Sequence, residues 1–184
     1  MRKVVVSNLV SLDGFIAGPS GETDWFSVGR DFQDFTKERL SSIGVILFGR
    51  VTYDLMAGYW PTASSEDNDP AIIDAMNTLP KIVFSRTLAS TEWNNAVINR
   101  GDPARETERM KAEGGKDIVI FGSGTMVSAL SAAGLVDEYR IFVNPVILGA
   151  GKTQFGGVGH RVGLRLKETK AFAGGLVLLT YTRD

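Results

Sequence analysis

Residues 117–126 read DIVIFGSGTM, and the fold is best predicted from this stretch. A short β-branched and aromatic run stops at Gly122-Ser123-Gly124, and a helical pattern follows at once. This order predicts a strand, a tight turn and a helix. A backbone without side chains can approach a ligand closely, and the free N–H groups at a helix start attract an anion such as phosphate. An ordinary strand-to-helix turn fits the stretch as well, because Val127 replaces the third glycine of the dinucleotide pattern GxGxxG.

Two other stretches repeat this pattern of an apolar run followed by a small residue. The apolar run at 45–48 ends in Gly49-Arg50, and the run at 82–84 ends in Ser85-Arg86. In an open α/β sheet, ligands bind outside the carboxyl ends of the strands, and the forked donors of arginine suit phosphate. The three strand ends together therefore predict one anion-binding cleft.

Composition narrows the class of protein. The 184 residues fit one domain, 1–184, and a net charge of −1 with 43% hydrophobic residues lacks the basic excess of a nucleic-acid binder. The chain has no cysteine and one histidine, His160, so no disulfide, thiolate nucleophile or metal site is expected. The valine run after Lys3 is broken by Ser7 and Asn8, too early for a signal peptide. These features predict a cytoplasmic protein without membrane association.

Strand and helix patterns alternate along the first part of the chain, which predicts an α/β fold. Asp69-Pro70 and Asp102-Pro103 each place a capping aspartate before proline at a helix start. We expect strands at 4–12, 45–48, 81–84, 96–99 (an edge), 117–120 and 139–144, and a terminal hairpin of 165–172 and 176–182. We expect helices at 31–42, from 50 onward, at 71–77, at 104–113, and from 124 to Gly134.

Several side chains stand out as candidates for the site. Asn8 is polar within an otherwise apolar strand, and Asp31 starts a helix, where it is an N-cap or, less favoured, a carboxylate aimed into a pocket. Trp25 and Phe26 in a loop cover either the core or a substrate. Residues 149–153, GAGKT, resemble the end of a P-loop, but Val146 occupies the position of its first glycine and further glycines oppose the required helix.

With these residues in hand, the chain resembles the dihydrofolate reductase superfamily, in particular the reductase domain of bifunctional riboflavin-biosynthesis deaminase-reductases. The resemblance covers nearly the whole chain. Its motifs are 11–14 (SLDG), Gly49-Arg50-x-Thr52, Ser85-Arg86, 122–124 (GSG), 136–138 (VDE) and 145–151 (PVILGAG).

The resemblance implies a three-layer α/β fold: a mixed, mostly parallel eight-stranded sheet with a C-terminal antiparallel hairpin. It implies NADPH as the cofactor and a homodimer, which we expect to form through residues 139–144 and the loop after Pro145. Cofactor contacts implied by the matching positions are Leu9, Ile16 and Ala17 beside the nicotinamide; Gly49, Arg50 and Thr52 at the adenosine and pyrophosphate; Ser85 and Arg86 at the 2′-phosphate; and Gly122, Ser123, Gly124 and Thr125 at the pyrophosphate.

The expected function is hydride transfer from NADPH to a small heterocyclic or ribosylaminopyrimidine-like substrate. Alternatives are a non-catalytic protein that binds NADPH or a flavin or pterin metabolite, and a reductase acting on a pterin. The riboflavin-pathway reductases usually carry lysine where this chain has Asn8. We expect Asn8, Trp25 and Met56 to face the substrate, and Asp31 or Asp13 to assist proton transfer.

Overall fold

The first strand, β1 (Val4–Val10), lies in the middle of the sheet. It pairs in parallel with β6 (Asp117–Ile120) on one side and β7 (Glu138–Val143) on the other. Val4 and Val6 pack into the cluster that includes Met110 and Met126, whereas Val5 packs into the opposite cluster, which includes Met76. Both faces of β1 are therefore buried, as its apolar sequence requires.

The computed structural model describes residues 2–183. The other strands are β2 (Phe15–Ala17), β3 (Ile43–Gly49), β4 (Lys81–Phe84), β5 (Ala96–Asn99), β8 (Lys152–Thr153), β9 (Leu164–Ala171) and β10 (Val177–Arg183). The α-helices are α1 (Arg30–Lys37), α2 (Arg50–Tyr59), α3 (Pro70–Thr78), α4 (Pro103–Ala112) and α5 (Gly124–Ala132), and short 3-10 turns are η1 (Leu40–Ser42), η2 (Trp60–Thr62) and η3 (Ala173–Gly175).

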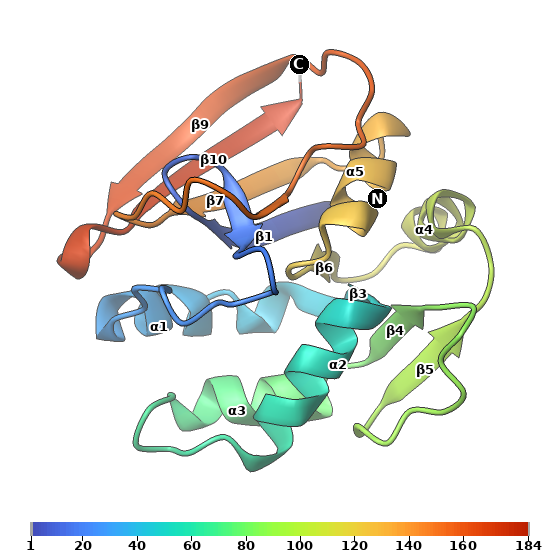
Figure 1. Cartoon of the computed structure of the whole chain (residues 1–184). Helices are drawn as coiled ribbons and strands as arrows, with labels where there is room; N and C mark the ends of the chain where they lie inside the picture. Colours follow the sequence, from blue (N-terminus) through green and yellow to red (C-terminus); the bar gives the residue numbers. More distant parts are fainter. Residues whose placement is uncertain (1, 184) are drawn as a thin grey trace.

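Eight strands form one sheet in the order β5-β4-β3-β6-β1-β7-β10-β9 (Figure 1). Strands β2 and β8 form a separate pair. The pairs from β5 to β7 are parallel, whereas β10 is antiparallel to both β7 and β9. Helices flank the sheet, with α4 and α5 contributing to one core cluster and α2 and α3 to the other. The predicted three-layer, mostly parallel sheet with its terminal hairpin is confirmed.

Local sequence signals explain most element ends. The carboxylate of Asp69 accepts from Ala71 N at 2.9 Å and that of Asp102 accepts from Arg105 N at 2.9 Å, so both predicted caps are confirmed. Gly134 follows α5 with φ of 69°, the left-handed conformation that ends helices. Strand β5 is an edge strand, as predicted.

Two predicted boundaries were wrong. The predicted helix 31–42 ends at Lys37, because the Arg39 guanidinium turns back to donate to Phe35 O at 3.0 Å and stacks on the Phe35 ring. The predicted strand 4–12 ends at Val10, because Gly14, with φ of 88°, closes a turn in which Gly14 N donates to Ser11 O at 2.9 Å. That turn leads into the pair β2–β8, which the sequence patterns did not indicate.

Strand β7 lies inside the sheet, between β1 and β10, so residues 139–144 offer no free edge. The expected dimer contact through residues 139–144 and the loop after Pro145 therefore cannot be a pairing of free strand edges, and it stays a prediction. Exposed apolar side chains lie instead on β9, where Leu164 is 38% and Leu166 is 51% exposed. Leu166 pairs with Tyr181, which packs beside the cluster under α5, so this face of β9 continues the α5 side of the sheet (Figure 1).

We propose that the homodimer forms through this apolar face of β9 and β10. An exposed edge strand with apolar side chains promotes association, and closed two-fold dimers are the commonest oligomers. Light scattering at micromolar concentration should give about twice the 19.9 kDa mass of one chain. Leu166→Lys should shift the protein toward monomer, whereas Val97→Lys on the opposite edge should not. A wild-type mass of one chain would exclude the dimer.

Lys81 at the start of β4 has no exposed surface. Its Nζ donates to the carbonyl oxygens of Leu79 at 2.7 Å and Asn94 at 3.0 Å, and lies 4.5 Å from the centre of the Trp93 ring. Burial lowers the pKa of Lys81 from 10.5 to about 8. The charged ammonium therefore costs the folded state stability, which is regained when the amine loses its proton.

This pKa predicts that the free energy of unfolding rises as pH increases from about 8 toward 10.5, because the unfolded chain binds more protons there. The contribution is on the order of 2 to 3 kcal/mol. Urea unfolding near pH 7.5 and near pH 10 should show this rise in the wild type relative to Lys81→Met. Lys116→Met, which removes an exposed lysine, should behave as the wild type. The same pH dependence in Lys81→Met would contradict the assignment.

Candidate active site

A cavity of about 690 Å³ opens at the carboxyl ends of β1, β3 and β6. The size is typical of a small-molecule or cofactor site. Its walls are the glycine turn after β6, the first turns of α2 and α5, the β2–β8 pair, and part of the loop before α1. The predicted residues that line it are Asn8, Leu9, Ile16, Ala17, Gly49, Arg50, Thr52, Met56, Gly122, Ser123, Gly124 and Thr125.

The glycine turn has two consecutive left-handed residues, Gly122 with φ of 61° and Ser123 with φ of 54°. A Cβ on Gly122 would lie 2.8 Å from Thr52 Cγ2, so only glycine fits there. Ser123 pays a steric cost for its conformation. Hydrogen bonds stabilise it: Ser123 N donates to Thr52 Oγ1 at 2.9 Å, and Gly49 N donates to Ser123 Oγ at 2.7 Å.

Asn8 binds the backbone of this turn. Gly122 N donates to Asn8 Oδ1 at 2.7 Å, and Asn8 Nδ2 donates to Gly122 O at 2.9 Å and to Gln154 Oε1 at 3.2 Å. Asn8 is 2% and Gln154 is 1% exposed. Both polar ends of the Asn8 amide are thus used inside the protein. The expected substrate contact of Asn8 is corrected to a positioning role for the glycine turn.

Two helices begin at the cavity. Helix α2 starts after Gly49 and helix α5 after Ser123, and neither N-cap residue caps its helix with a side-chain hydrogen bond. The first N–H groups of a helix carry partial positive charge and bind anions. Because the Ser123 hydroxyl bonds Gly49 N, the two helix starts are fixed relative to one another. The residues at both helix starts line the cavity, and their free N–H groups are suited to bind an anion there.

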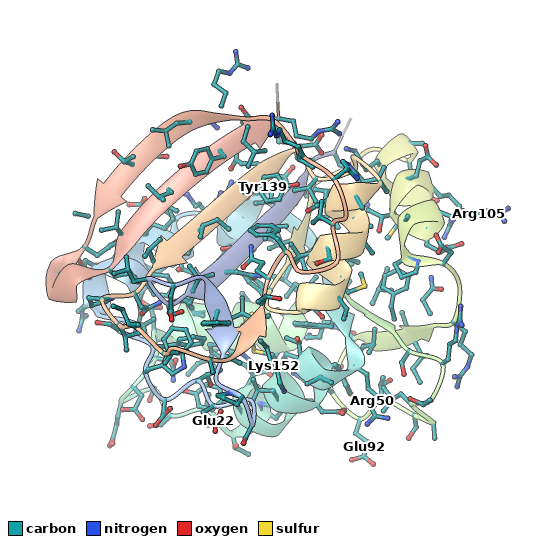
Figure 2. All side chains as sticks on the ribbon, turned by 45° about the horizontal axis from the view of Figure 1, so that its top comes forward. Glu22, Arg50, Glu92, Arg105, Tyr139 and Lys152 are labelled. Carbon is teal, nitrogen blue, oxygen red and sulfur yellow. The ribbon has the colours of Figure 1, made fainter. Side chains whose placement is uncertain are left out.

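The side chain of Arg50 adds positive charge beside these helix starts. Arg50 Nη1 donates to Thr87 Oγ1 at 3.0 Å, which places the start of α2 beside the turn after β4. Arg50 Nε also lies 3.6 Å from Asp54 Oδ2, in an exposed pair of the kind that adds little stability. Figure 2 shows Arg50 and Lys152 on the same side of the molecule.

Ser85 and Arg86 lie just outside the cavity lining. The Ser85 hydroxyl accepts from Leu88 N at 2.9 Å, and so shapes the turn after β4. Arg86 is exposed, and its carbonyl accepts from Arg100 Nη1 at 3.0 Å. Arg100, which the sequence analysis missed, therefore braces this turn from the end of β5.

The two carboxylates expected to assist proton transfer do not line the cavity. Asp13 is exposed and accepts from Ser11 Oγ at 2.6 Å and from Gly149 N at 2.8 Å. The Ser11 hydroxyl and these backbone N–H groups hold the pKa of the Asp13 carboxyl below its ordinary value, so it is a poor proton donor near neutral pH. Asp13 instead joins the turn before β2 to the loop before β8.

Asp31 also has a structural role. Gly29 is the N-cap of α1, so the favoured prediction that Asp31 caps the helix was wrong. Its Oδ2 accepts from Ala173 N at 2.6 Å, which ties α1 to the hairpin between β9 and β10. Asp31 is thus neither the N-cap nor a residue of the cavity lining. The sequence around Asp31 indicates only a helix start, and it gives no sign of a partner as distant as Ala173.

The two aromatic residues of the loop before α1, Trp25 and Phe26, have different surroundings. Phe26 lines the cavity, whereas Trp25 does not, and the predicted substrate contact of Trp25 is corrected. Trp25 Nε1 donates to Glu22 O at 3.0 Å and its ring packs edge-on against Phe26, with ring centres 4.6 Å apart. Trp25 therefore packs against Phe26 and does not itself line the cavity. Met56 lines the cavity, and its sulfur accepts from Trp60 Nε1 at 3.2 Å.

Lys152 and Thr153 are site residues that the sequence analysis did not select. They form β8, so GAGKT is no P-loop, and the rejection of that motif is confirmed. Both residues line the cavity because β8 pairs with β2, Lys152 opposite Ala17. The only sign of these residues in the sequence is that Lys152 and Thr153 are polar within a glycine-rich stretch. Their place at the cavity depends on the pairing of β8 with β2, which is distant in the chain.

Comparison with known proteins agrees with this geometry. Residues 2–178 match the model of the RibD C-terminal domain. The chain belongs to the RibD C-terminal domain family. Within the described residues, no helix is long and apolar enough to cross a membrane.

Similar proteins support the family and the fold. The uncharacterized protein YyaP of Bacillus subtilis (strain 168) is 35% identical over 182 residues, which cover 98% of this chain and 94% of YyaP. A Shewanella sp. PV-4 protein whose name assigns it to riboflavin biosynthesis superposes with a TM-score of 0.74 at 23% identity, covering 100% of this chain and 99% of that one. A Thermotoga maritima deaminase/reductase gives 0.70 at 15% identity, covering 100% of this chain and 57% of its own. The fold is thus dihydrofolate reductase-like, as the motifs indicated.

The buried contacts of Asn8 predict a large effect of its removal. Asn8→Leu leaves the N–H and C=O of Gly122 without partners, which should lower the free energy of unfolding by about 2 to 4 kcal/mol. Urea unfolding measures this change. Asn68→Leu, at a surface amide that bonds Tyr59 and Ser64, should cost less than about 1 kcal/mol. Equal effects of the two substitutions would contradict the positioning role of Asn8.

Proposed function

We propose that this chain is an NADPH-dependent reductase that transfers hydride to a small heterocyclic substrate, similar to the aminouracil reductases of riboflavin biosynthesis. The family and its reductase-type structural neighbours support an oxidoreductase role. The observation that carries the choice of cofactor is the pair of helix starts at one cavity. A dinucleotide has two phosphates to place at such helix starts, and NADPH has a third on its ribose.

The glycine turn and the two helix starts would hold the pyrophosphate. Gly122 and Gly124 let the turn pack tightly against the protein: a Cβ on Gly122 would lie 2.8 Å from Thr52 Cγ2, and a Cβ on Gly124 would lie 2.7 Å from Thr153 O. The backbone N–H groups at the start of α5 are thereby held at the cavity, where they would donate to the phosphates. Arg50, with Ser85 and Arg86 on the neighbouring turn after β4, would hold the 2′-phosphate. Leu9, Ile16 and Ala17 would form the apolar wall beside the nicotinamide, and exclude water from it.

When bound, NADPH supplies the hydride, and the protein orients the substrate and provides a path for the proton. No Asp or Glu is among the described residues that line the cavity. The proton is therefore expected from water or from a hydroxyl-bearing residue of the lining, such as Thr23. A pterin is disfavoured, because its basic amino-imine edge would find no carboxylate there.

The cavity also fits the alternative of a protein that binds NADPH without turnover. Ser7, Thr23 and Thr153 are hydroxyl-bearing residues that line the cavity, and such groups can take part in proton transfer. Their presence favours the reductase over the binding protein. Single-turnover oxidation of bound NADPH by a candidate substrate would separate the two functions.

The 2′-phosphate assignment predicts that NADPH binds far more tightly than NADH. One lost hydrogen bond to a charged group costs about 1.5 to 3 kcal/mol, so Arg50→Ala or Arg86→Ala should weaken NADPH about ten- to a hundredfold. NADH should be nearly unaffected, since it lacks the 2′-phosphate. Calorimetric titration of both cofactors against each variant measures this difference.

Arg109→Ala is the matched control, because Arg109 is exposed on α4 and pairs with Glu106 and Glu113 away from the cavity. It should bind both cofactors as the wild type does. Equal affinity of the wild type for NADH and NADPH, or equal losses for both cofactors in the two site variants, would refute the assignment.

A further inference from the structure

The part of the cavity away from the glycine turn is mostly apolar. Phe26, Leu55 and Met56 line it, from the loop before α1 and from α2. Leu55 is 52% exposed and, with Val51 one turn earlier at 69%, forms an apolar stripe at the rim. Exposed apolar residues that border a cavity mark a surface for binding apolar ligands. This wall suits a flat, apolar molecular body.

Two cations, Arg50 and Lys152, line the cavity, and Lys152 is the one that lies against the loop carrying Phe26. Lys152 lines the cavity from β8, and a Cβ on Gly21 would lie 3.3 Å from Lys152 Nζ, so the ammonium lies against the loop before α1. No described carboxylate lies within salt-bridge distance of Lys152, and the exposed Glu22 nearby uses its carboxylate to accept from Ser20 N at 3.0 Å. The ammonium is therefore available to a ligand.

The polar groups expected to recognise other ligands are absent or engaged. The Asn8 amide is bound to Gly122 and Gln154, so position 8 offers nothing to a phosphoribosyl group. Because no described lining residue is acidic, a basic ligand edge has no partner. A positive cavity without carboxylates selects for negative charge.

We propose that Lys152 and the apolar wall of Phe26, Leu55 and Met56 bind a planar, apolar substrate that carries one acidic group, a carboxylate or a phosphate. The proposal deepens the proposed function and rests on it, since this wall is left for the substrate once NADPH occupies the glycine turn. Lys152 binds the acidic group at the mouth, and the planar body lies on the apolar wall toward Leu9 and the nicotinamide.

A pair of fluorescent probes tests this arrangement. The probe 8-anilino-1-naphthalenesulfonate has a planar apolar body with one anionic group, and N-phenyl-1-naphthylamine has the same body without it. Both should bind the wild type in the presence of saturating NADP⁺. Lys152→Met should weaken the anionic probe about fivefold, as expected for one exposed ion pair, and leave the neutral probe unchanged. Lys152→Arg should retain the anionic probe.

Leu55→Asp should weaken both probes, whereas Val97→Asp, at a 58% exposed valine on β5, should weaken neither. Displacement of the anionic probe by 1-naphthoate or by 1-naphthyl phosphate shows which acidic group is preferred. The proposal is overturned if Lys152→Met weakens both probes equally or leaves the anionic probe unaffected. It is also overturned if Leu55→Asp leaves the binding of the probes intact. NADP⁺ affinity is titrated separately, so failure of cofactor binding would refute the proposed function and not be confused with failure at Lys152.

Discussion

The hydrogen bonds between the Asn8 side chain and the backbone of Gly122 hold the ligand-binding end of this molecule together. The parallel ladder between β1 and β6 ends at the pair of Val6 and Ile120. Two residues further along each strand, the ladder is continued by a side chain: Gly122 N donates to Asn8 Oδ1, and Asn8 Nδ2 donates to Gly122 O. Leaving them unpaired would cost on the order of 1 to 3 kcal/mol for each buried group. This pairing lets the chain leave the sheet and turn sharply into α5.

Hydrogen bonds from the same turn also fix the other elements that line the cavity. Ser123 reaches β3 through Gly49 N and reaches α2 through Thr52 Oγ1. Three strand ends and two helix starts are thereby fixed with polar contacts that need no ligand. Three carboxylates have partners of their own: Asp13 accepts from Gly149 N, Asp31 accepts from Ala173 N, and Asp54 pairs with Arg50. No Asp or Glu is among the described residues that line the cavity. The resulting cavity is positive and preorganised, which lowers the entropic cost of binding an anion.

The sequence predicted those parts of the fold that depend on local signals. Strand β4, the edge strand β5, the capped starts of α3 and α4, and the glycine turn all follow from short patterns of apolar, capping and turn residues. The unforeseen contacts of Asn8, Asp13 and Asp31 share one cause. The partners of Asn8, Asp13 and Asp31 are Gly122, Gly149 and Ala173, each more than a hundred residues away, and no local pattern reveals such contacts. Lys152 was missed for the same reason, because only pairing with β2 brings β8 to the cavity.

The place of β1 in the sheet also sets the order in which the chain can assemble. Strand β1 is synthesised well before its neighbours β6 and β7, which begin only at Asp117 and Glu138. The loops that must close to bring these strands together span most of the chain, and such non-local pairing slows folding. Until then the apolar Val4, Val5 and Val6 have no strand partner, and a nascent chain that stops short of β7 cannot complete the middle of its sheet. The sheet is therefore completed only after β7 has been made, and a chaperone that shields apolar segments has a long interval in which to bind β1.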